Sequence, residues 1–564
     1  MERYGKVALA AALAIALLSE VAVAQSKKAA GKAGASASAK NVILLIPDGA
    51  SLAPQTLSRW IKGSALSFDK YTCALVETHN SDMTIADSAP AGSAYATGFK
   101  SQTGNIASTG KVYTAPGISA PAIGELRPVA TVLEAAKLSG RSTGLVCTCE
   151  FMHATPADFA GHDPSRKNYD GLSEQIIFNN VDVVLGGGWS FLEAANRADK
   201  DNVIDQIAAR GYALVKTPAE LKVSKATKIF GLFAPKAMAY DLDRDPSKEP
   251  GLDEMTSKAI SALSANKNGF FLMVEGSKVD WAAHANDPVG IVSDFLAFDR
   301  ACNVALEFAA KDKNTIVIVV TDHGNSGFSI GDRSTSGSYD KTPYNTFYDP
   351  IKKATKTGEG LEAFIPADKG NVRDVVAKYY GINDLSDEEV AAIAKAAPGA
   401  LNAVVGPMMG SRARIGFTTG GHTGEDVVLS VYDPSGNRPT GVIDNTEIAR
   451  YIERSLALDL AAATDRLFAD AETAFGAKNA VVSVDATTDP ANVRLVAKKG
   501  DVELAIVQNR DYAIVKGIAK TAKGVYVLGK DADGKETLAI KADGVSLYNG
   551  KKWFVSRNLI DAIK

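Results

Sequence analysis

Carboxylate and imidazole side chains stand at the ends of three strongly apolar runs of the sequence. Asp48 comes directly after the first run, and Glu275 ends a later one. Asp322 and His323 together follow a third. Such runs are typical of buried parallel strands, whose carboxyl ends meet at one edge of an open α/β sheet, where ligands gather. The spacing therefore predicts that these four side chains converge on one site.

Two further histidines extend this set. Asp280 and His284 are four residues apart, so a helical turn would place both side chains on the same face. His422 stands in a Gly-Gly-His-Thr-Gly run, whose glycines allow the backbone to approach a bound group closely. A single histidine is more often an ordinary buried polar residue, but three of only six histidines occur in these settings. Mixed nitrogen and oxygen donors without cysteine favour zinc.

A run of small residues after Asp87 begins with the candidate nucleophile, Ser88. Pro90 fits the first turn of a helix, so Ser88 is expected at a helix N-terminus. Free N–H groups and the helix dipole favour a bound phosphate at such a position. The alternative is that Ser88 or Asp87 only caps the helix.

The segments that must position these residues alternate between apolar runs and helical patterns. This alternation predicts a doubly wound α/β fold, a parallel sheet sandwiched by helices. The expected strands are 41–46, 143–146, 181–185, 270–274, 315–320 and 427–431, and the expected helices are 128–138, 252–263 and 291–306.

Changes in composition divide the 564-residue chain into segments. Polar, Tyr- and Lys-rich sequence interrupts the alternation at 332–414, which we interpret as an insertion over the face that carries the site. The expected segments are a signal peptide at 1–24, a flexible linker at 25–40, the main α/β domain at 41–456, a helical linker at 457–479 and a small β-rich domain at 480–564.

The N-terminus has the features of a secretory signal peptide. Arg3 and Lys6 precede the apolar run 7–18, and the small residues at 22–24 fit a cleavage site. A membrane anchor is the alternative, but a spanning helix needs about 20 apolar residues. No later segment is apolar enough to cross a bilayer, so we expect a periplasmic or extracellular protein.

Net charge and cysteine content argue against a nucleic-acid-binding protein and against a disulfide-rich one. The formal net charge of −3 gives no indication of a nucleic-acid or anionic membrane surface. Four cysteines, Cys73, Cys147, Cys149 and Cys302, are too few for a dense disulfide framework. Cys147 and Cys149 are two apart on an expected strand, so they share one face and are assigned to the core. No Cys/His spacing matches a thiolate zinc site.

Eight short motifs, in order along the chain, resemble those of the alkaline phosphatase family. They are Pro47-Asp48-Gly49, Asp87-Ser88-Ala89, His153-Ala154-Thr155-Pro156, Ser165-Arg166, Val274-Glu275-Gly276, Asp280-x-x-x-His284, Thr321-Asp322-His323-Gly324 and Gly421-His422-Thr423-Gly424. The segment 444–447 is similar to one that the family carries after its last metal ligand. The resemblance covers about 41–456, and the order of the motifs makes it specific.

The resemblance implies an enzyme that hydrolyses small phosphate monoesters through a phosphoserine intermediate, with two zinc ions and one magnesium ion per chain. The implied ligands are Asp280, His284 and His422 for the first zinc, Asp48, Asp322 and His323 for the second, and Asp48, Thr155 and Glu275 for magnesium. Ser88 would attack phosphorus, and Arg166 would hold two phosphate oxygens with its planar fork. Asp87 would orient Arg166.

Two positions depart from the best-known bacterial member of that family, which has an acid at the position of His153 and a lysine at that of Trp281. An imidazole is a poorer magnesium partner than a carboxylate, so His153 leaves open which metal binds at the third site and how fully it is occupied. Trp281 removes a charged contact to phosphate. We therefore expect weaker binding of the phosphate product than in a lysine-containing relative.

Alternatives remain for the reaction and for the C-terminal domain. A related bimetal enzyme could act on phosphodiesters or sulfate esters, and a surface adhesin could keep a degenerate domain of this family. Arg166 and the magnesium ligands favour monoesters, and the complete ligand set argues against degeneration. The run 549–555 is similar to stalk-like repeats of bacterial surface proteins, so the domain could attach to the envelope or simply stabilise the enzyme. The resemblance also leaves a homodimer open.

Overall fold

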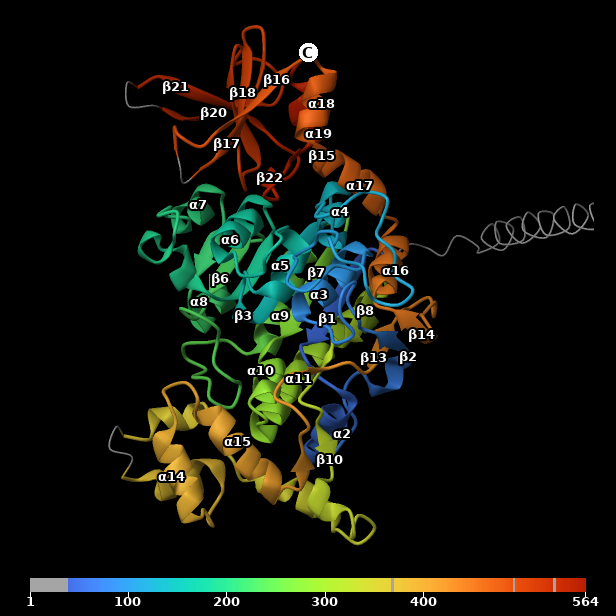
Figure 1. Cartoon of the computed structure of the whole chain (residues 1–564), viewed down its shortest axis with the longest axis vertical. Coiled ribbons are helices and arrows are strands. Elements are labelled where there is room, and N and C mark those ends of the chain that lie inside the picture. The colour runs from blue at the N-terminus through green and yellow to red at the C-terminus, as the bar shows by residue number, and fades with distance from the viewer. Residues whose placement is uncertain (1–38, 367–369, 490–491, 531–533) are drawn as a thin grey trace, which may run out of the picture. The chain divides into compact units, whose positions relative to one another are not determined.

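A ten-stranded, mostly parallel sheet forms the centre of the computed structural model, which describes residues 39–366, 370–489, 492–530 and 534–564 (Figure 1). Its strands, in spatial order, are β14 (Gly441–Asp444), β2 (Thr72–Glu77), β13 (Val427–Tyr432), β8 (Thr315–Val320), β1 (Asn41–Pro47), β7 (Phe270–Gly276), β3 (Ser142–Glu150), β4 (Val183–Gly187), β6 (Ile229–Leu232) and β5 (Ala213–Val215). The predicted leader at 1–24 and nearly all of the predicted linker at 25–40 lie outside the described residues.

Strands β1, β7 and β8 form the middle of the sheet. Strand β1 pairs in parallel with β7 on one side and with β8 on the other. Every residue of the three strands is buried, as their continuous apolar sequences predict. Their shared direction brings their carboxyl ends to the same edge of the sheet.

One expected parallel strand is antiparallel. Strand β13, predicted at 427–431, runs antiparallel to both β8 and β2. Just before it, the short strand β12 (His422–Thr423) pairs antiparallel with β9 (Gly324–Asn325), which follows β8. The chain therefore returns to the sheet at the carboxyl end of β8 and must run the opposite way. An apolar run alone carries no information about strand direction.

Helices cover both faces of the sheet (Figure 1). One layer consists of α2 (Leu52–Lys62), α9 (Leu252–Leu263) and α11 (Pro288–Asp312), and the other of α3 (Ser88–Thr97), α4 (Val132–Leu138), α5 (Ala154–Ala160) and α16 (Thr446–Leu456). Helices α4, α9 and α11 correspond to the three expected from sequence. This arrangement confirms the helix-sandwiched α/β fold.

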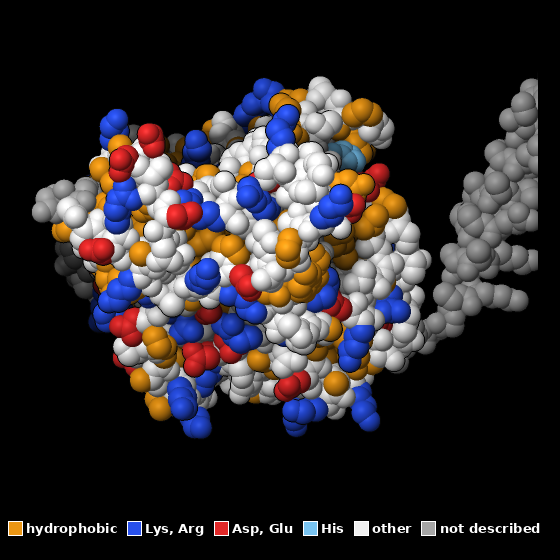
Figure 2. Space-filling model, turned by 90° about the horizontal axis from the view of Figure 1, so that it is seen from below, with side chains coloured by type: hydrophobic (Ala, Val, Ile, Leu, Met, Phe, Trp, Pro, Cys, Tyr) orange, Lys and Arg blue, Asp and Glu red, His pale blue; other side chains and the backbone are white. Residues whose placement is uncertain are grey.

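The predicted insertion at 332–414 forms short helices that pack beside α11. Among them, α15 (Leu401–Arg412) contacts α11 and also α14 (Asp387–Lys395). Leu401, Val405 and Met409 of α15 are fully or nearly fully buried in the same apolar core as the central sheet. On the face shown in Figure 2, acidic, basic and apolar side chains are interspersed.

The chain after α16 is β-rich, as predicted. Two short helices, α17 (Leu460–Leu467) and α18 (Ala471–Ala477), lead to an antiparallel sheet. Its strands, in spatial order, are β16 (Val481–Asp485), β17 (Arg494–Lys499), β18 (Val502–Val507), β19 (Tyr512–Lys516), β21 (Glu536–Lys541) and β20 (Val525–Lys530). A second small sheet joins β15 (Ala469–Asp470), β23 (Trp553–Val555) and β22 (Leu547–Tyr548). In the described ranges, no helix has the length and apolar character needed to cross a membrane.

Candidate metal centre

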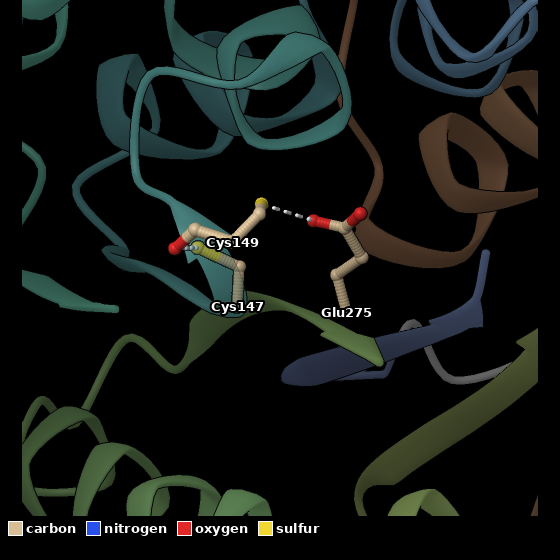
Figure 3. Close-up of side chains that lie close together, drawn as sticks. All are labelled: Cys147, Cys149 and Glu275. Atoms are coloured by element: carbon tan, nitrogen blue, oxygen red, sulfur yellow. Dashed lines mark hydrogen bonds between the residues drawn. The ribbon is translucent and has the colours of Figure 1, made fainter. Parts of the chain in front are cut away.

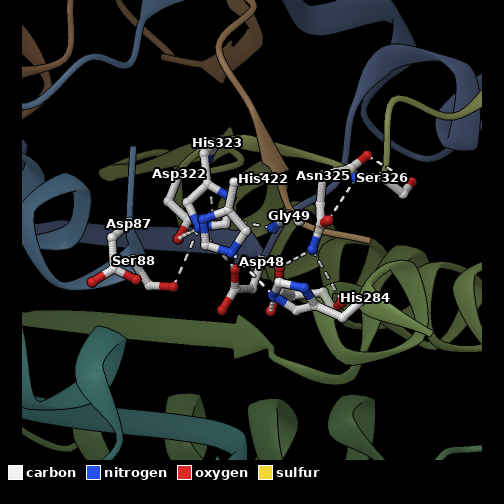
Figure 4. Close-up of polar contacts among 12 residues, drawn as sticks. Asp48, Gly49, Asp87, Ser88, His284, Asp322, His323, Asn325, Ser326 and His422 are labelled. Carbon is white, nitrogen blue, oxygen red and sulfur yellow. Dashed lines mark hydrogen bonds and ion pairs between the residues drawn. The ribbon is translucent and has the colours of Figure 1, made fainter. Parts of the chain in front are cut away.

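The first predicted trio of ligands comes together at the carboxyl edge of the sheet. Asp280 and His284 lie on one face of α10 (Lys278–His284), and His422 lies on β12. Nε2 of His284 is 3.3 Å from Asp280 Oδ2, and Nε2 of His422 is 3.6 Å from Asp280 Oδ1. The two Nε2 atoms lie 3.1 Å apart (Figure 4). Three potential ligand atoms therefore face one point.

The backbone fixes the orientation of both rings. His284 Nδ1 lies 2.8 Å from the carbonyl oxygen of Gly420, and His422 Nδ1 lies 2.7 Å from that of Ala86. A carbonyl can only accept a hydrogen bond, so each Nδ1 carries a proton and each ring directs its Nε2 toward the other ring and Asp280. Metal-bound histidines are typically oriented in this way. Contact with Asp280 raises the pKa of His284 to about 9, so positive charge is stabilised at this point.

The second trio lies beside the first and is completely buried. Asp48 follows β1, while Asp322 and His323 follow β8. His323 Nε2 lies 3.2 Å from Asp322 Oδ2 and 3.6 Å from Asp48 Oδ1. It also lies 3.2 Å from the Ser88 hydroxyl (Figure 4). The candidate nucleophile therefore adjoins the second trio.

Gly49 allows the two trios to approach each other. Its φ of +65° lies in the left-handed region, and a Cβ atom at this position would lie 2.5 Å from Asp280 Oδ1. Any other residue would therefore be strained and would collide with a ligand of the first trio. This requirement accounts for the glycine after Asp48 in the sequence.

Several buried carboxylate oxygens at the centre accept no hydrogen bond from the described residues. Both oxygens of Asp48, Oδ2 of Asp322 and Oε1 of Glu275 are buried without a hydrogen-bond partner in the described chain. Burial raises the pKa of Asp48 well above its usual range, and Asp322, Asp280 and Glu275 add like-charge repulsion. Burial and the charge of Asp322 raise the pKa of Glu275 to about 7. Buried, unpaired carboxylates of this kind are stable when they bind cations, so the donor set fits bound metals.

The predicted magnesium site has oxygen ligands, and two cysteine thiols lie close to one of them. Thr155, on α5, has a buried hydroxyl with no hydrogen-bond partner among the described residues. Cys149 donates a weak hydrogen bond to Glu275 Oε2 at 3.4 Å, and Cys147 lies beside it (Figure 3). Burial and the neighbouring Cys147 raise the pKa of the Cys149 thiol well above its usual value. Cys149 is therefore a buried thiol whose hydrogen bond helps to orient Glu275.

Ser88 is the first residue of α3 and is 2% exposed. Asp87 occupies the N-cap position, but in the described structure its side chain makes no capping hydrogen bond to α3. It accepts instead from Arg166 Nη1 at 2.5 Å. Tyr95, near the C-terminal end of α3, donates to the carbonyl oxygen of Thr321 at 2.7 Å and ties this helix to the end of β8. The helix thus fixes the serine relative to the second trio.

His153 and Trp281, the two residues that differ from the best-known bacterial member of the family, contact each other beside Arg166. Arg166 Nη2 lies 3.2 Å from His153 Nε2, and the rings of His153 and Trp281 meet edge to face with centroids 6.0 Å apart. Burial and the charge of Arg166 lower the pKa of His153 to about 3, so this imidazole is neutral. Lys278 also contacts Trp281, with Nζ 4.3 Å from the centroid of its ring and 4.1 Å from that of Tyr240.

Sequence reasoning missed three residues that support this centre. Asn325 donates to Asp280 Oδ1 at 2.6 Å, and Asp158 accepts from Ser93 of α3 at 2.8 Å. Lys278 is 2% exposed and pairs at 3.7 Å with Glu359, which lies in the predicted insertion. The proximity of Asn325 to His323 was a usable signal. Nothing in the local sequence distinguished the other two residues.

Comparison with known proteins identifies the same family as the sequence motifs. The model of the alkaline phosphatase family matches residues 39–458. Alkaline phosphatase 4 of Bacillus subtilis is 38% identical over 452 residues, which cover 77% of this chain and 92% of that protein. Alkaline phosphatase 3 of the same organism is 34% identical, with 80% and 96% covered.

Solved structures agree with the sequence matches. The alkaline phosphatase of Thermus thermophilus is 27% identical, superposes with a TM-score of 0.66, and covers 75% of this chain and 92% of its own. A cold-active alkaline phosphatase from a Shewanella species is 28% identical with a TM-score of 0.64, covering 74% and 100%. With its fold, its ordered motifs and these relatives, the chain belongs to the alkaline phosphatase family of metal-dependent phosphoric monoester hydrolases.

Proposed function

We propose that this chain is an exported phosphomonoesterase that works through a phosphoserine intermediate at a two-zinc and one-magnesium centre. The observation that carries the proposal is the group of buried carboxylate oxygens without hydrogen-bond partners, in the second His/Asp trio and on Glu275, beside Ser88. Such a group needs cations for its stability, and a serine beside them is activated as a nucleophile. Family membership supports the reaction class.

The first zinc would be held by Asp280, His284 and His422, and the second by Asp48, Asp322 and His323. Each trio offers ligand atoms that all lie within 4.8 Å of one another. Magnesium would be held by Asp48, Thr155 and Glu275. Bound zinc ions would stabilise negative charge on the attacking and leaving oxygens of an in-line displacement.

The chain's own residues would bind and attack the ester. Arg166 presents a fork of N–H donors that matches two phosphate oxygens, and Asp87 holds that fork beside the serine. Ser88 Oγ would form a bond to phosphorus as the ester P–O bond breaks and the alcohol leaves. Water would then cleave the phosphoserine, releasing phosphate and restoring the Ser88 hydroxyl. The loss of the Ser88 proton is favoured by the positive charge that the site is built to hold.

A phosphomonoester has three unsubstituted oxygens, so two can pair with Arg166 while the third stays free for a bound cation. A diester has only two, so we expect the monoester to be preferred. The experiment compares the turnover of an aryl phosphate with that of the matching aryl phosphodiester by zinc- and magnesium-loaded protein. We expect the monoester to be favoured by several orders of magnitude. Chelation should abolish turnover, and zinc should restore it. A preference for the diester, or turnover that survives complete chelation, would contradict the proposal.

Export and assembly are separate parts of the proposal. The signal features of 1–24 support a periplasmic or extracellular location, where the β-rich domain at 480–564 could also contact the cell envelope. A homodimer is the assembly we would test first. Cell fractionation with detection of the shortened N-terminus tests export, and light scattering of the purified enzyme tests assembly.

A further inference from the structure

One turn of the C-terminal sheet is built into the phosphatase domain. We call this turn, Gln508–Asp511 between β18 and β19, the docking turn. Asn509, Arg510 and Asp511 are only 8%, 3% and 5% exposed, although they belong to a hairpin turn. Loops normally lie on the surface, so their burial needs a specific cause. All three residues contact α6 (Tyr169–Phe178) or the chain that follows it.

The strongest contact is a buried cluster of ions. Arg510 Nη1 lies 2.8 Å from Glu174 Oε2, and its Nη2 lies 2.8 Å from Asp201. Glu174 is shared with Arg197, a fully buried arginine whose Nη2 lies 2.9 Å from Glu174 Oε1. Leaving any of these charges without its partner would be strongly unfavourable. The docking turn is therefore held in one position against α6.

An aromatic ring completes the contact. The guanidinium groups of Arg510 and Arg210 lie 4.4 Å and 4.2 Å from the ring centroid of Phe178, at the end of α6. Asp511 accepts from Asn180 at 2.9 Å and pairs with Arg210. Cation–π and ionic contacts thus surround the C-terminal end of α6.

A second line of contacts leads from the docking turn toward Arg166. Asn509 Oδ1 accepts from Gln175 Nε2 at 3.1 Å. The Gln175 side chain in turn accepts from the backbone N–H of His162 at 2.6 Å and donates to the backbone carbonyl of His162 at 3.1 Å. His162 is four residues before Arg166, and α6 begins three residues after it, at Tyr169. The short segment that carries Arg166 is therefore anchored at both ends by groups that the docking turn holds.

A second C-terminal element lies against the same segment. Tyr548 and Phe554, on the strands β22 and β23, line a small cavity together with Asp163 and Pro164. The guanidinium of Arg166 also pairs with Asp87, so its position depends on both its own segment and the start of α3.

The C-terminal domain thus contacts the segment that carries Arg166 through the docking turn and through β22 and β23. A domain that served only for attachment would not need these specific contacts.

We propose that the docking turn is a positioning element for Arg166, and that the C-terminal domain is a working part of the phosphate-binding site. This inference rests on the proposed role of Arg166. It assigns to Asn509 and Arg510 an indirect effect on the affinity for phosphate, although neither residue touches the substrate. Weakening the docking turn should let the Arg166 segment move and should loosen the two-oxygen clamp.

The test is a double-mutant cycle on the metal-loaded, full-length enzyme. Asn509→Gly removes the side chain but suits the backbone, because Asn509 has a φ of +59°. The inhibition constant for inorganic phosphate is measured for Asn509→Gly, for Arg166→Ser and for the double variant. We expect Asn509→Gly to raise this constant roughly fivefold to tenfold, within the range of coupled neighbouring residues. In the Arg166→Ser background the same change should have no effect.

Two further variants make the outcome unambiguous. Lys516→Met is the matched control, since Lys516 is exposed and pairs with Glu503 within the C-terminal sheet, so phosphate inhibition should not change. Tyr548→Ala is the alternative probe should Asn509→Gly fail to fold, and it should also weaken phosphate binding only when Arg166 is present. Equal effects in both backgrounds, or no effect in the wild-type background, would overturn the inference. An Arg166→Ser variant with unchanged phosphate inhibition would instead overturn the role proposed for Arg166.

Discussion

Arg166 donates through Nη1 to Asp87 at 2.5 Å, and Asp87 immediately precedes Ser88 in the chain. Asp87, at the N-cap of α3, thus pairs with Arg166, which we propose binds phosphate, and leaves the helix end without a side-chain cap. The proposed nucleophile and the proposed clamp are joined by one carboxylate. This relationship leads to the first prediction.

Asp87→Asn should weaken phosphate binding without removing the nucleophile. An amide keeps the shape and can still accept one hydrogen bond, but it loses the charge that holds the Arg166 guanidinium. We expect the inhibition constant for phosphate and the KM for an aryl phosphate to rise by about tenfold, as for loss of a charge-assisted hydrogen bond. Steady-state kinetics measures both. Wild-type values for both constants would show that Asp87 does not orient the clamp.

Trp281→Lys should tighten phosphate binding. It brings an ammonium group next to His153 and Arg166, where the phosphate oxygens are expected, although the neighbouring Lys278 reduces the gain by repulsion. The inhibition constant for phosphate should fall several-fold, and Trp281→Phe, which keeps an aromatic ring, should leave it near the wild-type value. An inhibition constant that is the same in all three proteins would disprove the idea.

His153→Asp should increase magnesium retention. The native imidazole is neutral, because burial and Arg166 lower its pKa to about 3, so it adds no negative charge to the third site. A carboxylate prefers magnesium as a hard oxygen donor. Elemental analysis after gel filtration should find more magnesium per chain in His153→Asp than in wild type or in the neutral control His153→Asn. Equal magnesium in the Asp and Asn variants would contradict this.

Asp287 should make stability depend on pH. This fully buried carboxyl group caps α11 and accepts from Tyr380, yet burial raises its pKa to about 6. A raised folded-state pKa gives stability that is complete below the unfolded value of about 4 and is lost as pH rises through about 6. The full difference is on the order of 3 kcal/mol.

Asp287→Asn keeps one of the two capping oxygens and cannot ionise, so the lost hydrogen bond lowers stability equally at every pH. Its melting temperature relative to wild type should therefore increase between pH 4 and pH 7. The metal ligands titrate alike in both proteins, so their effect cancels in the difference. A difference that stays constant over this range would show that Asp287 is not the responsible group.

The sequence predicted the parts of the fold that depend on local pattern. Strands β1, β7 and β8 are apolar along their whole length, and α9 and α11 carry clear helical periodicity, so all five were expected within a few residues. Strand β2, which lies between the edge strand β14 and β13, alternates between buried and exposed residues, and β5 has only three residues, so neither gave a comparable signal. The direction of β13 depends on the return of the chain at β12, which is a property of tertiary structure.

The candidate site was predictable where ligands follow strand ends or repeat at helical spacing. Asp48 and Asp322 illustrate the first case, and Asp280 with His284 the second. Lys278 could not be predicted, because its role comes from the rings of Tyr240 and Trp281 and from Glu359, which is distant in sequence. The docking turn was missed for the same reason, since its partners lie more than 300 residues earlier.

The most direct test of the central claim is acid quenching of the metal-loaded enzyme during turnover, followed by mass spectrometry to locate bound phosphoryl groups. We predict a phosphoryl group on Ser88 in the wild-type protein. Ser88→Ala should lack it, should keep its metals, and should hydrolyse an aryl phosphate at least about 10³-fold more slowly. Turnover at the wild-type rate by metal-loaded Ser88→Ala, or a phosphoryl group on a different residue, would contradict the account.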